Sequence, residues 1–287
     1  MKTLLLCTDG SRFATPLYQY GAWLATQMAA RINILSVTDI RSQKVASTGN
    51  LSGSIGLGAS EELLKELVNL EHERAKLNNQ RAKLILKNAA QAMEAAGVTA
   101  FDLTHRTGFL VDCLEEFEAQ SDLIVLGKRG EAADFAAKHL GANVERIVRS
   151  SGKSCLVTPR EFRPIERILI AYDGSGSGRK ILQFLVDTPS FHGLEIHVLT
   201  VGKQAEDPTA IARIGEAQQW LAAGGMNPQC QWVVGEPEKA IAQYITEANI
   251  DLLFMGAYGH SRIRQLVIGS TTVQLLRSCT IPIFLCR

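Results

Sequence analysis

The chain of 287 residues is long enough for two domains of ordinary size. Hydrophobic residues make up 46% of the chain and charged residues 21%, which excludes the disordered, collagen-like and membrane-spanning classes. The 30 Lys and Arg residues nearly balance the 29 Asp and Glu residues, for a formal charge of +1. The chain as a whole therefore does not attract polyanions, and we expect neither nucleic acid nor a membrane as its partner.

The first residues and the cysteines bear on the compartment. Only Leu4 to Cys7 form an apolar run before Thr8 and Asp9, whereas a signal peptide has an apolar region of about 7 to 15 residues. The six cysteines form no C-x-x-C pair and no cluster at zinc-finger spacing. We therefore expect a cytoplasmic protein without a metal site.

An internal repeat divides the chain into two halves. Three segments of the first half reappear in the same order in the second half, including an apolar run that ends in Asp-Gly-Ser. The matches are 2–12 (KTLLLCTDGSR) with 167–177 (RILIAYDGSGS), 122–130 (DLIVLGKRG) with 251–259 (DLLFMGAYG), and 141–151 (GANVERIVRSS) with 269–279 (GSTTVQLLRSC). The repeat predicts two domains of one fold, at 1–160 and 164–287, with a boundary in the proline-containing, charged stretch 158–166.

Short apolar runs alternate with longer amphipathic stretches in both halves, which is typical of parallel βαβ units. We expect strands near 3–7, 32–37, 101–105, 122–126 and 154–158, and again near 167–172, 195–201, 230–234, 251–255 and 281–286. In the second half we expect helices near 177–187, 208–223, 237–248 and 270–278. The expected fold is α/β, with two tandem, Rossmann-like, doubly wound sheets of five parallel strands.

The first half contains an insert near 41–75. Its Ser- and Gly-rich part, 41–60, has the composition of a flexible linker. A long helix is expected over 61–96, with Ser60 as N-cap and Gly97 as its stop.

Leucines recur along this long helix at spacings of three and four residues. They are Leu63, Leu67, Leu70, Leu77 and Leu84, and Arg74 and Arg81 interrupt the pattern. Two interpretations are open at this point. The helix either packs along its own sheet or forms a coiled-coil arm for a partner chain, although three uninterrupted heptads are lacking.

The most informative motif lies in the second half. Two residues separate Gly256 from Gly259, and nine residues separate Gly259 from Gly269. Gly269 is followed by Ser270, Thr271 and Thr272 at the start of a helical pattern. Glycines after a strand let backbone N–H groups approach an anion, and a helix N-terminus offers N–H groups and the positive end of its dipole. The motif therefore predicts a phosphate cradle at the carboxyl edge of a parallel sheet, where Asp173 also ends a strand.

This motif resembles the ATP-binding signature of the universal stress protein family. The resemblance implies that Asp173 contacts the adenosine portion and that the backbone of Val201 contacts adenine. It also implies that Gly256, Gly259, Gly269, Ser270 and Thr271 bind ribose and phosphates, with Thr272 beside them. The implied ligand is ATP, or ADP or AMP, with Mg²⁺ accompanying the phosphates.

The first half departs from the motif. Gly127 and Gly130 are present, but ten residues precede Gly141, and Ala142 and Asn143 replace the hydroxyl side chains. Two alternatives remain: a second nucleotide site built from Asp9, these three glycines and Asn143, or a degenerate half whose glycines serve only as turns.

Other nucleotide motifs are missing from the sequence. No Walker A motif occurs, and GSIGLG at 53–58 lacks the preceding strand of a dinucleotide site. His260, Arg262 and Arg264 either neutralise phosphates or belong to a solvated loop. We expect a nucleotide-binding stress regulator rather than an enzyme, the alternatives being a slow ATPase or a scaffold that uses the long helix.

The resemblance also bears on assembly. Single-domain family members pair through their last strands, so the strands at 154–158 and 281–286 are expected to pair within this chain. The molecule would then be its own pseudo-dimer, and a homodimer of the whole chain is compatible with this arrangement.

Overall fold

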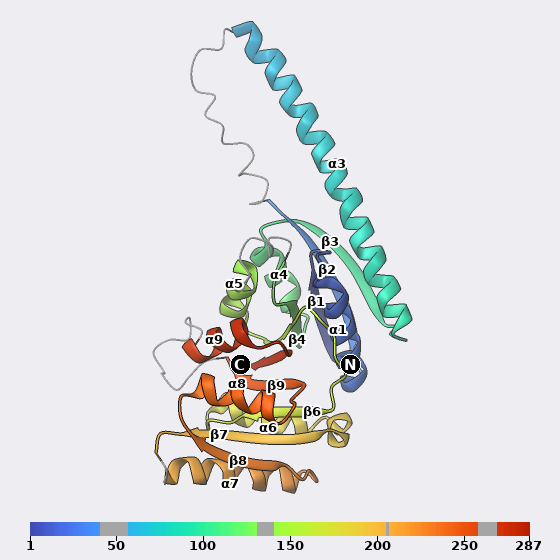
Figure 1. Ribbon diagram of the computed structural model, residues 1–287. Helices are drawn as coiled ribbons and strands as arrows, with labels where there is room; N and C mark the ends of the chain where they lie inside the picture. Colours follow the sequence, from blue (N-terminus) through green and yellow to red (C-terminus); the bar gives the residue numbers. More distant parts are fainter. Residues whose placement is uncertain (41–56, 131–140, 205–206, 258–268) are drawn as a thin grey trace.

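The computed structural model describes residues 1–40, 57–130, 141–204, 207–257 and 269–287. These residues form one sheet of ten strands with helices on both faces (Figure 1). The strands are β1 (Thr3–Thr8), β2 (Arg31–Asp39), β3 (Phe101–Gly108), β4 (Leu123–Gly127), β5 (Ser154–Thr158), β6 (Arg167–Ala171), β7 (Glu195–Gly202), β8 (Gln229–Val234), β9 (Leu252–Gly256) and β10 (Ile283–Cys286). Each expected strand is confirmed within a few residues at its ends.

The helices fill the connections between the strands. They are α1 (Ala14–Met28), α3 (Leu57–Ala95), α4 (Leu110–Glu118), α5 (Ala142–Ser150), α6 (Gly176–Val186), α7 (Pro208–Ala223), α8 (Pro237–Glu247), α9 (Ser270–Ser278) and the short 3-10 helix η2 (Pro189–Gly193). Local sequence sets several of these starts. At α7, the Asp207 carboxylate accepts hydrogen bonds from the N–H groups of Thr209 and Ala210, and Pro208 occupies the first turn. The four helices expected in the second half are confirmed.

The strand order shows two copies of one topology. It reads β3-β2-β1-β4-β5 in the first half and continues as β10-β9-β6-β7-β8 in the second. All neighbours within a half are parallel, and the order reverses between β1 and β4 and between β6 and β9. The crevice beyond the carboxyl ends of the strands at such a reversal is where open α/β sheets bind ligands.

The two halves join through β5 and β10, the one antiparallel pair among the described strands. Ile283 lies opposite Val157, and Leu285 lies opposite Cys155. The expected intrachain pairing of the last strands is thus confirmed. Because this pair is antiparallel, the carboxyl edges of the two halves face opposite ends of the joint sheet.

Two cations also connect the halves. The Lys128 ammonium donates to the carbonyl oxygens of Arg277 (3.1 Å) and Cys279 (2.7 Å), at the end of α9. Conversely, the Arg287 guanidinium donates to the carbonyls of Val148 (3.1 Å) and Arg149 (2.8 Å), at the end of α5. Cations are favourable at helix C-termini, where carbonyl groups lack intrahelical partners. Each half therefore supplies a charge that satisfies the last helix of the other.

Hydrophobic side chains cover both faces of the sheet. Along β1, Leu4 and Leu6 belong to the core shared with α1, α3, α6 and α7, whereas Leu5 belongs to the core shared with α4, α5, α8 and α9. A cluster of aromatic rings lies in the first of these cores. Phe284 of β10 packs on Phe254 (ring centroids 4.7 Å apart) and Phe184 (5.2 Å), and Trp23 of the first half meets Phe191 edge-on at 5.8 Å.

The long helix differs from its expected form at its start. It begins at Leu57, so Ser60 lies inside the helix and its prediction as N-cap was wrong. The expected end is confirmed, because α3 stops at Ala95 and Gly97 adopts a left-handed φ of 76°. The Ser- and Gly-rich stretch 41–56 lies outside the described residues.

Only the C-terminal part of α3 packs on the body. Ala82, Ala89 and Met93 are buried, whereas Leu70 and Leu77 are 65% and 63% exposed. Figure 1 shows the N-terminal part of the helix reaching well beyond the sheet. The interpretation that α3 packs along its own sheet is therefore wrong for this part. The reason is length, since 39 helical residues span about 58 Å and the nine residues of β2 about 30 Å.

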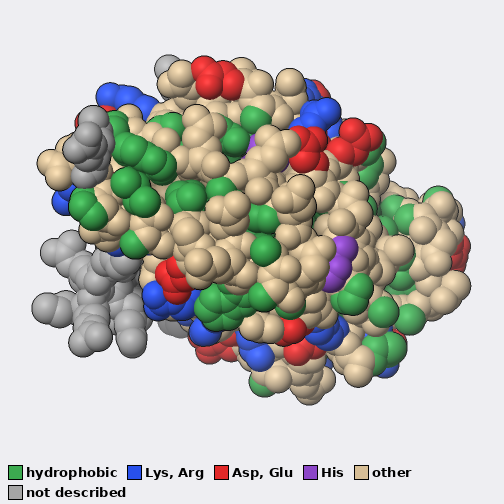
Figure 2. Space-filling view, turned by 90° about the horizontal axis from the view of Figure 1, so that it is seen from below, with side chains coloured by type: hydrophobic (Ala, Val, Ile, Leu, Met, Phe, Trp, Pro, Cys, Tyr) green, Lys and Arg blue, Asp and Glu red, His purple; other side chains and the backbone are tan. Residues whose placement is uncertain are grey.

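The surface at the β8 end of the sheet mixes charges of both signs. Figure 2 shows acidic and basic side chains near one another around the border of this face, with hydrophobic and other uncharged surface in its middle. None of the described helices combines the length and the apolarity that crossing a membrane requires.

We predict that Phe284→Ala lowers the free energy of unfolding by about 3 to 5 kcal/mol, because the ring is buried in the aromatic cluster beside β5. Phe101→Ala, at the outer edge strand β3, is the matched control and should cost less than half as much. Urea unfolding of both variants checks this. Equal losses would show that the centre of the sheet contributes no more to stability than its edge.

Candidate functional site

The second half places its motif residues at the strand reversal. Asp173 follows β6, Gly256 ends the neighbouring β9, and Val201 is the last but one residue of β7. These three residues lie at the carboxyl ends of adjacent strands, as the motif predicted for a ligand crevice. Gly259, His260, Arg262 and Arg264 lie outside the described residues.

A tight turn fixes the Asp173 carboxylate. The Ser175 N–H donates to its Oδ1 at 2.9 Å, and Gly174 adopts a left-handed φ of 74°. The Ser175 hydroxyl in turn caps α6 by accepting a hydrogen bond from the Gly178 N–H at 3.1 Å. The sequence Asp-Gly-Ser therefore holds the carboxylate at the crevice and starts the following helix.

A cation next to this turn was missed by the sequence analysis. A Cβ atom at Gly174 would lie 3.1 Å from Nε of Arg213, so this side chain of α7 reaches over the turn. Arg213 is half-buried there. No local signal marks it in the sequence, because it lies forty positions after Asp173 and one helical arginine resembles any other.

The start of α9 has the geometry expected of an anion cradle. Gly269 is its N-cap residue, with φ −59° and ψ 144°, and no described side chain caps the first turn. Ser270 is exposed and Thr271 is half-buried. The N–H groups of this turn, which no described side chain engages, and the nearby hydroxyls are thus suited to bind phosphate oxygens.

Thr272 has a different position from its neighbours. It is 3% exposed, and its hydroxyl lies 3.4 Å from the carbonyl oxygens of both Gly256 and Ala257, as a donor to them. Its hydrogen bonds fix the first turn of α9 against the end of β9. The residue therefore positions the cradle from inside the protein.

The first half has the same Asp-Gly-Ser turn, but a different side chain lies over it. The Ser11 N–H donates to Oδ1 of Asp9 at 3.0 Å, and Gly10 has a φ of 70°, as at Gly174. The side chain that covers this turn is Ile85 of α3, since a Cβ at Gly10 would lie 2.5 Å from its Cγ1. An apolar group thus occupies the place that Arg213 takes in the second half.

The motif glycines Gly130 and Gly141 of the first half contact other residues of the same half. A Cβ at Gly130 would lie 2.5 Å from Oδ2 of Asp9, so the carboxylate packs directly against this glycine. The Gly141 N–H donates to the carbonyl of Lys128 at 3.3 Å. Its φ of −59° and ψ of 131° match those at Gly269 despite the extra residue, and Asn143 is exposed on α5.

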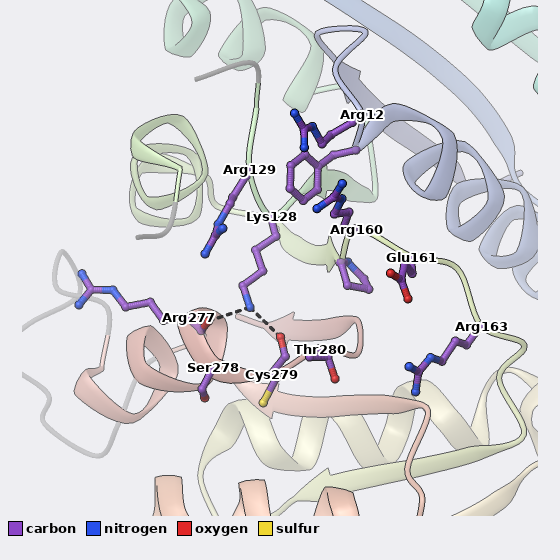
Figure 3. Close-up of a pocket in the computed structure, with 12 residues that line it drawn as sticks. Arg12, Lys128, Arg129, Arg160, Glu161, Arg163, Arg277, Ser278, Cys279 and Thr280 are labelled. Carbon is purple, nitrogen blue, oxygen red and sulfur yellow. Dashed lines mark hydrogen bonds between the residues drawn. The ribbon is translucent and has the colours of Figure 1, made fainter. Parts of the chain in front are cut away.

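A positively charged pocket of about 320 Å³ lies beside the segment that follows the Asp9 turn, at the junction of the two halves (Figure 3). Among the described residues, it is lined by one carboxylate, Glu161, and by several cations. These are Arg12, Lys128, Arg129, Arg160, Arg163 and Arg277. Lys128 crosses the pocket to the end of α9, and burial lowers the pKa of its ammonium to about 8. The charge of the lining makes the pocket attractive to anions.

The part of the chain that the structure describes contains no cluster of three or more His, Cys, Asp or Glu side chains placed to hold a metal ion. All six cysteines are free thiols. Burial raises the pKa of Cys279, which follows α9, and of Cys286, which ends β10. At neutral pH both thiols therefore stay protonated and pack as small apolar groups.

Comparison with known proteins agrees with the geometry. The Universal stress protein family matches residues 1–159 and 164–287. The chain belongs to the universal stress protein family. Universal stress protein Slr1230 from Synechocystis sp. is 54% identical over all 287 residues, with complete coverage of both chains.

Solved structures of tandem length share the fold of this universal stress protein. The structure of a universal stress protein from Archaeoglobus fulgidus has a TM-score of 0.70 and 22% identity, and covers 99% of this chain and 98% of its own. A putative universal stress protein from Pseudomonas aeruginosa has a TM-score of 0.65 and 14% identity, with 100% and 93% coverage. Both support a continuous α/β sheet made of two family units.

We predict that the stability supplied by Lys128 depends on pH. Its folded-state pKa of about 8 lies below the usual value near 10.5, so the unfolded chain holds the proton longer. The free energy of unfolding of the wild type, relative to Lys128→Met, should therefore rise between pH 8 and pH 10.5 by about 2 kcal/mol.

Urea unfolding at several pH values checks this, with Lys83→Met on the exposed side of α3 as control. A difference between wild type and Lys128→Met that stays constant with pH would contradict the burial of the charge.

Proposed function

We propose that the second half binds an adenine nucleotide, with ATP as the leading candidate, and that the protein acts as a nucleotide-dependent regulator in the stress response. The observation that carries this proposal is the start of α9. Its first turn is uncapped by any described side chain and lies at the end of β9, beside the reversal of strand order. Phosphate groups are the ligands best matched to such a turn.

The neighbouring residues fit the remainder of a nucleotide. The Asp173 carboxylate accepts hydrogen bonds, which suits the hydroxyls of ribose and opposes direct contact with phosphate. Val201 offers backbone groups at the end of β7 for the edge of adenine. Arg213 brings a positive charge to the same turn, and Mg²⁺ is expected to enter with the phosphates.

We infer that the first half does not bind nucleotide in this way. Ile85 covers the Asp9 turn, and the Asp9 carboxylate packs on Gly130. The Gly141 N–H already donates a hydrogen bond to the backbone carbonyl of Lys128. A phosphate at this position would meet a carboxylate and an apolar side chain. The glycines of the first half are retained, in this proposal, for the close backbone packing they allow.

Binding rather than turnover is the favoured activity. Phosphoryl transfer needs a positioned nucleophile and metal-holding carboxylates in addition to a cradle. In the described part of the crevice the acidic residue is Asp173, and its carboxylate already accepts a hydrogen bond from the Ser175 N–H. Slow hydrolysis is the alternative, and formation of ADP in the binding assay distinguishes it. The free cysteines accord with a cytoplasmic location.

We predict that Gly269→Glu abolishes ATP binding, because a carboxylate placed at the start of α9 takes the phosphate position and repels the ligand. Gly141→Glu makes the same change at α5 and is the matched control. Calorimetric titration of nucleotide-stripped protein with ATP and Mg²⁺ should give about one site per chain for wild type and Gly141→Glu, and none for Gly269→Glu.

The opposite pattern, with binding lost only in Gly141→Glu, would assign the nucleotide to the first half. No binding by folded wild-type protein would overturn the proposed function in favour of a scaffold.

We further predict that Arg213→Ala weakens ATP binding about tenfold, as expected for the loss of one charge-assisted contact. Arg179→Ala removes the same charge from the neighbouring helix α6, where the guanidinium pairs with Glu216 at 2.6 Å. Titration should show an affinity for Arg179→Ala close to that of wild type. Equal weakening by both variants would mean that Arg213 acts only through long-range charge.

A further inference from the structure

The exposed part of α3 carries a regular stripe of leucines. Leu63, Leu70, Leu77 and Leu84 follow one another at intervals of seven residues, and Leu67 lies between the first two. Leu67 is 42% exposed, and Leu70, Leu77 and Leu84 are each more than 60% exposed. A row of exposed leucines along a projecting helix marks an interaction surface. These five residues form the leucine stripe.

The leucine stripe points away from the protein body. The helix contacts the body through Ala82, Ala89 and Met93. Leu84 follows Ala82 by two positions, which is a rotation of about 200° around the helix. The stripe therefore stays accessible even at the level where α3 packs on the sheet, and further out the helix is clear of the body (Figure 1).

Charge is distributed unevenly along the same helix. In its outer part Glu66, Glu71 and Glu73 outnumber Lys65. Further in, the charged residues between Arg74 and Met93 are all basic, namely Lys76, Arg81, Lys83 and Lys87. Such a helix is complementary to a second copy of itself only when the two run in opposite directions.

The heptad register gives the same answer. With Leu63, Leu70, Leu77 and Leu84 at the d positions, the a positions are Leu67, Arg74, Arg81 and Asn88. Parallel pairing places Arg74 against Arg74 and Arg81 against Arg81 at the centre of the contact. Antiparallel pairing with Leu67 opposite Leu84 of the second copy places each arginine opposite a leucine. The arginine stem can then cover apolar surface while its charge stays in water.

The flanking charges distinguish the two directions further. In this antiparallel register Glu66 lies beside Lys87 of the second copy, at both ends of the contact. In parallel pairing Glu66 lies beside Glu71 of the second copy, and the like charges repel.

We propose that α3 is a dimerisation arm, through which two copies of this chain pair antiparallel along the leucine stripe, with Leu67 opposite Leu84. The contact is formed by α3 of the first half alone. It is independent of the proposed nucleotide function, since it uses no residue of that site.

The experiment measures self-association of the full chain by sedimentation over a hundredfold range of protein concentration. A concentration-dependent dimer is expected for the wild type. Leu67→Asp and Leu84→Asp should each weaken dimerisation about tenfold or more, because both place a charge at an apolar contact. Val68→Asp is the matched control, one residue off the stripe and 66% exposed. It should leave dimerisation unchanged, although Val68 is more exposed than Leu67.

Charge reversal tests the direction of pairing. Glu66→Lys and Lys87→Glu should each weaken the antiparallel dimer, and the double variant should restore it, with an effect that fades at high salt. In a parallel dimer Glu66→Lys would instead strengthen association. Circular dichroism and melting temperature close to wild type establish that each variant is folded.

A wild-type chain that stays monomeric at all concentrations overturns the proposal. So does a dimer that is unaffected by both leucine substitutions, since another surface then forms it. A dimer strengthened by Glu66→Lys overturns the antiparallel geometry.

Discussion

The antiparallel pairing of β5 with β10 is the contact on which the remaining architecture depends. Each half alone would end in an edge strand, β5 or β10, with unpaired backbone groups. Pairing these two strands joins the halves into one sheet and gives their backbone groups hydrogen-bond partners. The same pairing places the loop that enters β10 at the carboxyl edge of the first half. Lys128 can therefore bind the end of α9, and Arg287 can bind the end of α5. The halves are thereby fixed to one another by backbone, charge and the aromatic cluster together.

The two halves share a backbone framework but not its chemistry. Both have a left-handed glycine after Asp, a strand ending in glycine and a helix starting at glycine with nearly identical dihedral angles. What differs is the side chains placed on that framework. The second half has hydroxyls at the helix start and Arg213 over its turn, whereas the first half has an alanine, Asn143 and Ile85. A duplicated fold can keep its shape in both copies because the glycines act through backbone geometry alone.

The sequence predicted the features that depend on local pattern. Apolar runs bounded by charged or glycine residues located each strand, and the family resemblance predicted the pairing of the last strands. Ser60 was misplaced as a cap because the helix extends back into a stretch whose composition favours a linker. Arg213, Ile85 and Lys128 could not be predicted, because their importance comes from contacts made across the fold by residues far apart in the chain. The exposure of the leucines likewise depends on the length of α3 relative to the sheet, which periodicity does not reveal.

One change of element accounts for much of the asymmetry between the halves. The helices α3 and α7 occupy equivalent places, each following the second strand of its half, but α7 has 16 residues and α3 has 39. In the second half the helix contributes a cation to the Asp-Gly turn. In the first half the longer helix contributes Ile85 to that turn and extends an apolar stripe beyond the body. The replacement that places an apolar side chain over the Asp9 turn is thus the same one that exposes the leucine stripe, the surface that we propose for association. The two proposed roles are compatible in one tandem chain, because the antiparallel junction places the carboxyl edges of the two halves at opposite edges of the sheet.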